Sequence, residues 1–314
     1  MKDIFVSGFN EQPPNYPGGI WMLRDDQVVP LHSGPGVFGL CWSQAHALLL
    51  GVTRVEQLPV VAFRKVDGNR YVPLHVEYRH YIPARRAHGI YLFKNKLYVV
   101  AAQGDPDARL CTNEDYVGHY VGKVIISNLE VSADCVLISD SFVWNPYECD
   151  HHHHYNDILV DDNFIYLASF STCDAQQRYI SRGAVTRFSH KLSEPTIMTD
   201  ELVAPHSLQL CEGKLFVCSS STSSVMSVPL RVESRKTKLE FKTLNNFIRG
   251  LIVTSDYFFI GLSRSAGRTN SAHLTEAING ILKFNRKDGT TTKIEMPVNC
   301  DNVYSLAVLI QETT

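Results

Sequence analysis

The chain has 314 residues, of which 44% are hydrophobic and 20% charged, and its formal net charge is −2 at pH 7. These are the values of a globular protein with a sizeable core. The near-neutral charge, and the lack of a basic stretch interleaved with aromatic residues, argue against nucleic acid and against an anionic membrane as partners.

The N-terminal segment is not typical of a signal peptide, because it carries Asp3 and no long apolar core. The apolar run from 47 to 52 is too short to span a membrane. None of the eight cysteines forms a CxxC pair. Together these features predict a cytoplasmic protein with free thiols.

One sequence pattern recurs along the chain: a short strand of apolar residues, a polar turn, and a second short strand rich in β-forming residues. It begins at residues 38, 88, 156, 206 and 249, with spacings of 50, 68, 50 and 43 residues. Such spacings are typical of propeller blades with insertions. Each occurrence of the pattern therefore predicts the inner hairpin of a blade, and the later segments 122–126, 183–188 and 280–284 predict third strands.

The two ends of the chain have complementary gaps in this pattern. Residues 304–309 have the pattern of an inner strand with no partner after it, whereas residues 3–7 and 19–23 have the pattern of second and third strands with no inner strand before them. Joining them removes exposed sheet edges. The sequence thus predicts an all-β, six-bladed β-propeller, one domain over residues 1–314, whose last blade combines the C-terminal inner strand with the N-terminal strands.

The residue that opens each inner strand is expected at one mouth of the central channel, because the four strands of a blade run alternately up and down. These positions hold Phe38, His88, Asn156, His206, Arg249 and Tyr304. The long segments that contain Tyr179, Arg264 and Arg268 return to the same face. Binding residues concentrate on such segments of a rigid scaffold, so we expect the functional site at this mouth.

A run of four histidines, residues 151–154, directly precedes the inner strand at Asn156. In an extended segment alternate residues share one side, so either His152 and His154 or the other two are expected to point inward. With His88 and His206 they predict one divalent metal ion, zinc, iron or manganese. The alternative is that these imidazoles only form hydrogen bonds. No nucleotide-binding motif is present, so no nucleotide cofactor is expected.

The remaining mouth residues predict substrate contacts. Arg249 presents a planar fork suited to a carboxylate or phosphate, and Arg264 and Arg268 are expected to add to this anion site. A structural ion pair of Arg249 with Asp157 or Asp301 is the competing interpretation. Asn156 is expected either to ligate the metal or to orient a substrate hydroxyl, and Tyr179 to line the site.

These residues predict a small-molecule enzyme, a hydrolase, lyase or isomerase, acting on a polar anionic substrate. The catalytic candidates are His88, His206 and Tyr304, with a metal that activates water or, without metal, a histidine as general base. The alternative is a propeller that binds a ligand or a protein without chemistry.

Two short motifs, Pro205-His206-Ser207 and Arg249-Gly250-Leu251, each open an inner strand. In these residues the chain resembles a bacterial propeller family known only as a domain of unknown function, most closely over residues 88–262. More loosely, it is similar to six-bladed lactonases and strictosidine-synthase-like propellers. The resemblance to lactonases implies metal-binding acidic and amide residues at the mouth. Here the ring holds histidines and lacks their glutamate, which counts against lactone hydrolysis.

Overall fold

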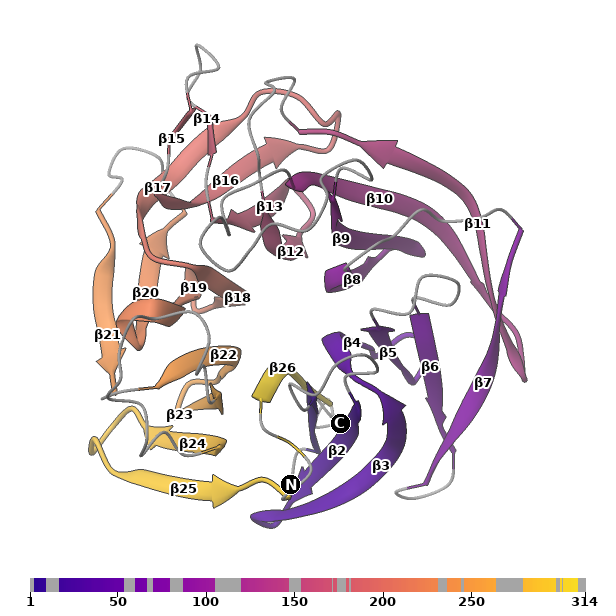
Figure 1. The fold of residues 1–314 in the computed structure, drawn as a ribbon, viewed down its shortest axis with the longest axis horizontal. Coiled ribbons are helices and arrows are strands. Elements are labelled where there is room, and N and C mark those ends of the chain that lie inside the picture. Colours follow the sequence, from indigo (N-terminus) through magenta and orange to yellow (C-terminus); the bar gives the residue numbers. More distant parts are fainter. Residues whose placement is uncertain are drawn as a thin grey trace.

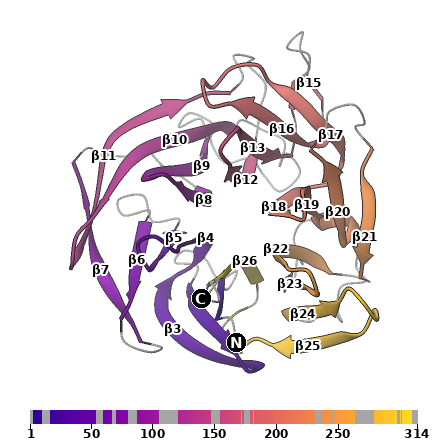
Figure 2. The same cartoon turned by 180° about the vertical axis from the view of Figure 1, so that it is seen from behind.

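The computed structural model of the chain describes residues 3–9, 17–53, 60–66, 70–79, 87–104, 120–146, 154–170, 172–173, 179–180, 182–230, 236–243, 246–263, 279–297, 300 and 302–309. These residues form six sets of four antiparallel strands, set in a ring around a central axis (Figure 1). The view from behind shows the same closed ring, with one strand of each set nearest the axis (Figure 2). The predicted all-β propeller is confirmed.

We number the blades along the ring from the one that holds both chain ends. Blade 1 consists of β26 (Asn302–Val308), β1 (Ile4–Phe9), β2 (Pro17–Arg24) and β3 (Gln27–Pro35). Blade 2 consists of β4 (Val37–Ser43), β5 (Leu48–Thr53), β6 (Val60–Lys65) and β7 (Tyr71–Tyr78). Blade 3 consists of β8 (Ala87–Phe93), β9 (Lys96–Gly104), β10 (Tyr120–Val131) and β11 (Cys135–Trp144).

The other three blades follow in chain order. Blade 4 consists of β12 (Tyr155–Val160), β13 (Phe164–Ser169), β16 (Gly183–Ser189) and β17 (Thr196–Leu202). A two-stranded hairpin, β14 (Thr172–Cys173) and β15 (Tyr179–Ile180), lies within its β13–β16 connection. Blade 5 consists of β18 (Pro205–Cys211), β19 (Lys214–Ser219), β20 (Ser224–Pro229) and β21 (Lys238–Lys242), with a 3-10 turn, η1 (Ser220–Thr222). Blade 6 consists of β22 (Phe247–Val253), β23 (Tyr257–Ser263), β24 (Gly280–Asn285) and β25 (Thr291–Glu295).

Blade 1 closes the ring as the sequence predicts. Strand β1 pairs antiparallel with both β2 and β26, and Ile4 lies opposite Val308. The backbone N–H of Leu309 also donates to the carbonyl of Asp3 at 2.9 Å. The side chain of Asp3, which is buried, accepts from Arg24 at 2.7 Å and from the Tyr71 hydroxyl at 3.1 Å. This carboxylate therefore ties the N-terminal strand to blade 1 and to the outer strand of blade 2.

Two links between blades were not predicted from the sequence. The outer strands β7 and β11 pair in parallel, with Cys135 opposite His75, so the outer edges of blades 2 and 3 are joined (Figure 1). A single bridge between Ser263 and Asn302 joins β23 to β26, and so blade 6 to blade 1. Both links join residues far apart in sequence, which no local pattern reveals.

Apolar side chains fill the spaces between neighbouring blades. Leu48 and Leu50 of blade 2, for example, pack in one cluster with Leu97 and Val99 of blade 3. Each fully buried aliphatic side chain contributes about 1.5–3 kcal/mol of transfer free energy.

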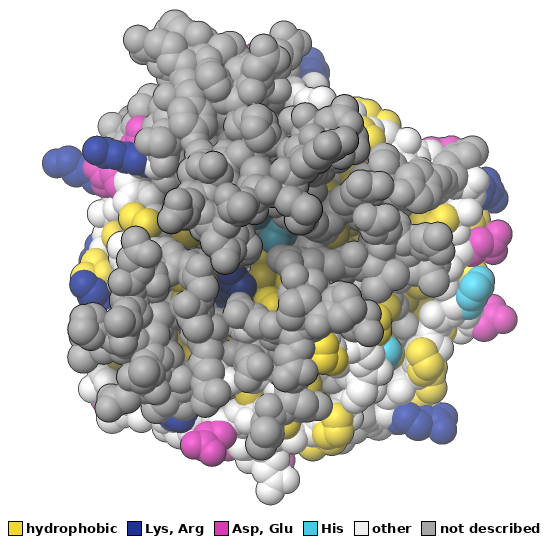
Figure 3. All heavy atoms as spheres, viewed as in Figure 1, with side chains coloured by type: hydrophobic (Ala, Val, Ile, Leu, Met, Phe, Trp, Pro, Cys, Tyr) yellow, Lys and Arg dark blue, Asp and Glu magenta, His cyan; other side chains and the backbone are white. Residues whose placement is uncertain are grey.

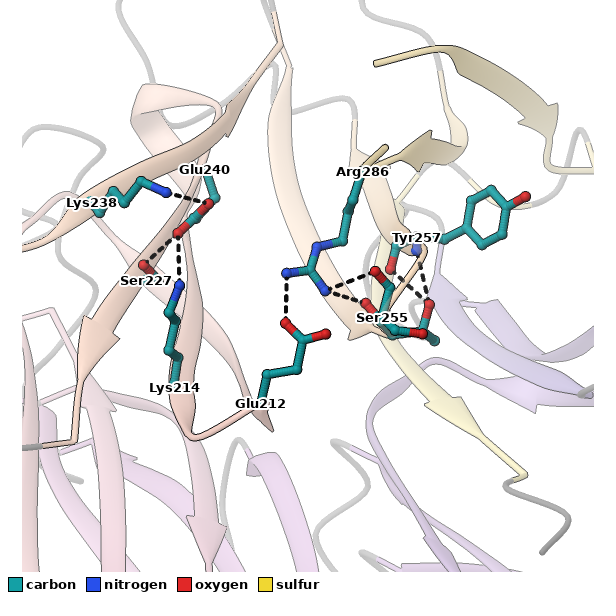
Figure 4. A network of polar contacts seen from close by, with 9 residues as sticks. Glu212, Lys214, Ser227, Lys238, Glu240, Ser255, Tyr257 and Arg286 are labelled. Carbon is teal, nitrogen blue, oxygen red and sulfur yellow. Dashed lines mark hydrogen bonds and ion pairs between the residues drawn. The ribbon is translucent and has the colours of Figure 1, made fainter. Parts of the chain in front are cut away.

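Charged groups bridge blades 5 and 6 at the surface. Arg286 donates to Glu212 at 3.0 Å and to the carbonyls of Thr254 and Ser255, while Glu240 binds Lys238 and Ser227 on blade 5 (Figure 4).

The inner strands carry β-bulges at the positions that open toward the channel. Phe38, His88, Asn156 and Tyr304 are each the extra, unpaired residue of such a bulge. In β18 and β22 the register shifts directly after His206 and Arg249. Because a bulge re-aims a side chain relative to the sheet, the repeated bulge directs these side chains away from the blade cores.

The residue after each of these positions is small or acidic, and together these residues form an inner ring. Its members are Gly39, Gly89, Asp157, Ser207, Gly250 and Ser305. Side chains of this ring bind the backbone of the next inner strand. The Ser305 Oγ accepts from Leu40 N at 3.2 Å, an Asp157 oxygen from Leu208 N at 2.7 Å, and the Ser207 Oγ from Gly250 N at 2.8 Å.

At two positions of the inner ring, steric contacts explain why the residue is a glycine. A Cβ at Gly89 would lie 2.7 Å from a carboxylate oxygen of Asp157, and Gly250 has φ +70° with Leu306 2.9 Å from its Cβ position. A side chain at either position would push neighbouring inner strands apart.

The only helical element among the described residues is η1, and no helix there is long and apolar enough to cross a membrane. Among the described residues Cys41, Cys135, Cys211, Cys218 and Cys300 are free thiols.

We expect Asp157 to make stability depend on pH. Burial raises its pKa to about 7 from an ordinary value of 3.8, although hydrogen bonds from Leu208 N and Ile158 N lower it. The folded state therefore holds this proton more tightly, and the group's contribution to the free energy of unfolding falls as pH rises from about 4 to about 7. The slope is at most about 1.4 kcal/mol per pH unit.

Chemical denaturation of the wild type and Asp157→Asn between pH 5 and pH 8.5 measures this effect. The histidines are common to both proteins, so they cancel in the difference. We expect the unfolding free energy of the wild type relative to the variant to fall up to about pH 7 and then level off. A difference that is constant with pH would contradict the assignment.

Candidate functional site

The ring of Tyr304, on β26 of blade 1, contacts side chains from four other blades. Its centroid lies 4.9 Å from that of Phe38, 5.9 Å from His88 and 6.1 Å from His206, and the guanidinium carbon of Arg249 lies 4.6 Å from it. All five side chains are buried. The structure therefore brings these predicted mouth residues together around one phenol ring. We call this set, together with the neighbouring Phe9, His154 and Asn156, the mouth ring.

The mouth ring has an apolar side and a polar side. Phe9 and Phe38 pack with Tyr304 on the side of blades 1 and 2, with the two phenylalanine centroids 4.5 Å apart. Blades 3 to 6 contribute His88, His154, Asn156, His206 and Arg249. A small ligand at this mouth would meet hydrocarbon on one side and hydrogen-bonding groups on the other.

A chain of three side chains runs from the centre of the mouth ring to blade 4. The Tyr304 hydroxyl is hydrogen-bonded to Nδ1 of His88, and Nε2 of His88 is 2.9 Å from Nε2 of His154. Two imidazole nitrogens form a hydrogen bond only when one of them carries a proton and the other does not. Both nitrogens of His88 are thus engaged, and moving a proton along the chain would reverse both bonds.

His206 is held in one orientation by the residues around it. Its Nδ1 lies 2.9 Å from the carbonyl of Ala204 and 2.9 Å from the Oγ of Ser220 in η1. The positive φ of Ala204, +52°, belongs to the turn that places this carbonyl beside the imidazole. A carbonyl can only accept, so Nδ1 carries the proton and Nε2 of the neutral ring is an acceptor.

Arg249 lies against two aromatic rings. Its guanidinium carbon is 4.5 Å from the centroid of Phe247 and 4.6 Å from that of Tyr304. His206 contacts the same two rings, with centroid distances of 5.7 and 6.1 Å. The guanidinium and the imidazole thus share two aromatic neighbours, Phe247 and Tyr304. The competing interpretation named Asp157, whose carboxylate accepts instead from Leu208 N; Asp301 lies outside the described residues.

Asn156 is buried, and its amide orientation is fixed. Its Nδ2 donates to the carbonyl of Pro205 at 2.8 Å, directly before His206. Its Oδ1 has no hydrogen-bond partner in the described part of the chain.

Two contributors to the site were missed in the sequence. The ring of Phe170, directly after β13, lies 5.0 Å from His154 and 5.9 Å from His206 between centroids, and Ser220 holds His206 as described. Phe170 carries no signal beyond its place at a strand end, and Ser220 is one of several serines in a row.

The described histidines do not fit the metal site predicted from the sequence. No group of three or more histidine, cysteine, aspartate or glutamate side chains among the described residues could hold an ion. The physical reason is that His88 and His154 bind each other, while Phe170 and Tyr304 each contact His206 as well as one member of that pair. The alternative, imidazoles that hydrogen-bond to one another, describes this geometry.

Several predicted residues lie outside the description. His152, Arg264 and Arg268 are not among the described residues. The backbone of Tyr179 pairs with Cys173 in the small hairpin, and its side chain is outside the described part.

In the space-filling view, histidine and cationic side-chain surfaces are visible near the centre of the face (Figure 3). Their position agrees with a ring of polar groups close to the propeller axis.

Comparison with known proteins gives one family match. A family model described as a domain of unknown function, DUF4915, matches residues 140–314, which include both Pro205-His206-Ser207 and Arg249-Gly250-Leu251. No curated protein sequence matches the chain.

Solved structures match over most of the chain. A chain from a nidogen/laminin complex matches with a TM-score of 0.65 at 10% identity, and the match covers 98% of this chain and 98% of that one. A 6-phosphogluconolactonase candidate from Bacteroides fragilis has a TM-score of 0.59 at 10% identity, again covering 98% of both. Regucalcin, a calcium-binding protein from Agrobacterium tumefaciens, has a TM-score of 0.50 at 9% identity, covering 84% of this chain and 75% of its own. At these identities the likeness shows the propeller fold alone.

We expect nuclear magnetic resonance to detect the tautomer of His206. In long-range proton–nitrogen spectra at pH 8, its Nδ1 should have the shift of a protonated nitrogen and its Nε2 that of an unprotonated one. The spectrum of His206→Gln assigns the signals by their loss. A protonated Nε2 with an unprotonated Nδ1 would contradict the hydrogen bond to Ala204.

Proposed function

Since the chain belongs to the DUF4915 family, whose domain has no assigned function, we propose from its own residues that it is a small-molecule enzyme with general acid–base chemistry at the mouth ring. Its substrate is a small polar anion. One observation carries the proposal. The oriented imidazole of His206 contacts the ring of Tyr304, and the hydroxyl of the same ring begins the hydrogen-bonded chain to His88 and His154.

Arg249 binds the anionic group in this proposal. A guanidinium that lies over aromatic rings keeps a planar set of N–H donors suited to a carboxylate or phosphate. Its contacts with Phe247 and Tyr304 limit its rotamers, so little entropy is lost when the anion binds.

His206 is the general base. Its Nε2 accepts a proton from water or from the substrate, and the positive charge that develops on the ring is stabilised through Nδ1–H by the carbonyl of Ala204 and the hydroxyl of Ser220. The same arrangement keeps the imidazole from rotating.

Tyr304 is the general acid. Its hydroxyl donates a proton to the leaving or carbonyl oxygen of the substrate, and His88 supplies a proton to the phenolate oxygen through Nδ1. His154 then passes a proton to Nε2 of His88. One proton has then left this chain and His206 has taken up one, so the return of that proton from His206 to His154 through solvent completes the cycle and restores the acid.

Hydrolysis of an acyl–oxygen bond is the reaction that suits this arrangement best. His206 removes a proton from water, the hydroxide adds to the carbonyl carbon, and Tyr304 protonates the departing oxygen as the acyl–oxygen bond breaks. The name of the similar Bacteroides fragilis protein, a 6-phosphogluconolactonase candidate, points to hydrolysis of an anionic substrate on this fold. Elimination or isomerisation would use the same base and acid.

A second candidate is a propeller that binds a protein partner, as the nidogen/laminin complex illustrates for a similar fold. Binding propellers commonly present exposed aromatic groups. The exposed large apolar side chains of the described residues are Val29, Phe142, Val143, Val203 and Leu239. Among the described residues they are scattered over four blades, and none belongs to the mouth ring.

We expect His206→Gln to lower kcat/KM at least about 100-fold, because a general base contributes about 10²–10⁴ in rate. The assay follows, by nuclear magnetic resonance, the consumption of a panel of small carboxylate- and phosphate-bearing esters and lactones. His46→Gln is the matched control: His46 is a half-buried imidazole in the turn between β4 and β5, bound to Asn95 at 2.8 Å and away from the mouth ring. If no member of the panel is consumed, or if His206→Gln keeps full activity, the proposal is wrong.

A further inference from the structure

We infer that the side-chain oxygen of Asn156 accepts a hydrogen bond from a hydroxyl group of the ligand. The ligand of the mouth ring is then a small hydroxy-carboxylate whose carboxylate binds Arg249. This inference rests on the anion site of the proposed function. It adds the second group that the ligand must carry and the residue that selects it.

The amide of Asn156 has one possible orientation. The carbonyl of Pro205 can only accept a hydrogen bond, so the atom 2.8 Å from it must be the amide nitrogen. The other end of the amide is then an oxygen, and it is buried with no partner among the described residues. A buried acceptor left without a donor is destabilising, and native chains keep few of them.

The position of Asn156 directs this oxygen to the ligand site. Asn156 is the extra residue of the β12 bulge, the same place that His88 occupies in β8 and Tyr304 in β26. Its amide nitrogen binds the residue directly before His206. The amide of Asn156 therefore lies next to the segment that carries the oriented base, on the blade before that of His206 and two blades from that of Arg249.

An acceptor requires a donor on the ligand, and the charges of the site favour a hydroxyl over an ammonium. None of the mouth-ring residues named above is a carboxylate, and Arg249 is a cation. An ammonium would enter this site without an anionic partner from those residues and beside a positive charge. A neutral hydroxyl donates to Asn156 without that cost, and its own oxygen can accept in turn.

The test compares matched ligands on the wild-type protein. Each set holds a hydroxy acid, its methoxy analogue, its deoxy analogue and its amino analogue, for example lactate, 2-methoxypropanoate, propanoate and alanine. A second set uses 3-hydroxybutanoate and its three counterparts, since the spacing between the groups is part of the question. Dissociation constants come from nuclear magnetic resonance titration at constant ionic strength.

We expect the hydroxy acid of at least one set to bind about tenfold or more tightly than its three counterparts. The methoxy analogue keeps the oxygen but cannot donate, so it separates donation from simple polarity. In Asn156→Leu the preference should disappear while the deoxy acid binds as before. Should that variant not fold, the comparison of the four ligands on the wild type still decides the matter.

Arg249→Met separates failure of this inference from failure of the proposed function. Its matched control is Arg187→Met, which removes an arginine stacked on Phe164 at 4.1 Å in β16. Equal binding of hydroxy, methoxy and deoxy acids, lost in Arg249→Met but not in Arg187→Met, would overturn the hydroxyl inference and leave the anion site intact. If no carboxylate binds the wild type, both are wrong.

Discussion

The close packing of six inner strands around one axis is the constraint on which the rest of the structure depends. At Gly89 and Gly250 the neighbouring inner strand leaves no room for a Cβ, and Ser305, Asp157 and Ser207 use that proximity to bind the next strand's backbone. The bulges beside this inner ring turn the preceding side chains toward the axis. The mouth ring is thus a direct consequence of how the blades meet, and its groups are held by the closely packed inner strands.

This arrangement explains how several buried polar side chains can converge without destabilising the protein. Each one is bound by a neighbour: His206 by Ala204 and Ser220, His88 by Tyr304 and His154, and the Asn156 amide nitrogen by Pro205. Such networks fix one geometry only when their members are satisfied. The Asn156 oxygen, by contrast, has no hydrogen-bond partner in the described part of the chain, and a buried acceptor of this kind is where a ligand group is expected.

Much of the fold could be predicted from the sequence, because the blade repeat and the complementary chain ends are local patterns. These patterns predicted the strand pairs, the closure through β26, and the positions of the mouth residues at the start of each inner strand. The details of the site could not be predicted in this way. The tautomer of His206 depends on the carbonyl of Ala204, and Phe170 packs against His206; neither contact can be read from the repeat. The metal prediction required three imidazoles to converge, whereas in the described part of the chain His88 and His154 form a pair and His206 contacts Phe170 and Tyr304 instead.

The central claim is that the mouth ring binds a small anion through Arg249 beside an oriented base. The most direct measurement is a crystal structure of the protein soaked in the hydroxy-carboxylate that binds most tightly in the titrations. We expect electron density for the carboxylate on the Arg249 guanidinium, with the Phe247 and Tyr304 rings in place and the ligand hydroxyl on Asn156. A mouth that holds only ordered water at saturating ligand, or a carboxylate bound elsewhere on the protein, would contradict the account.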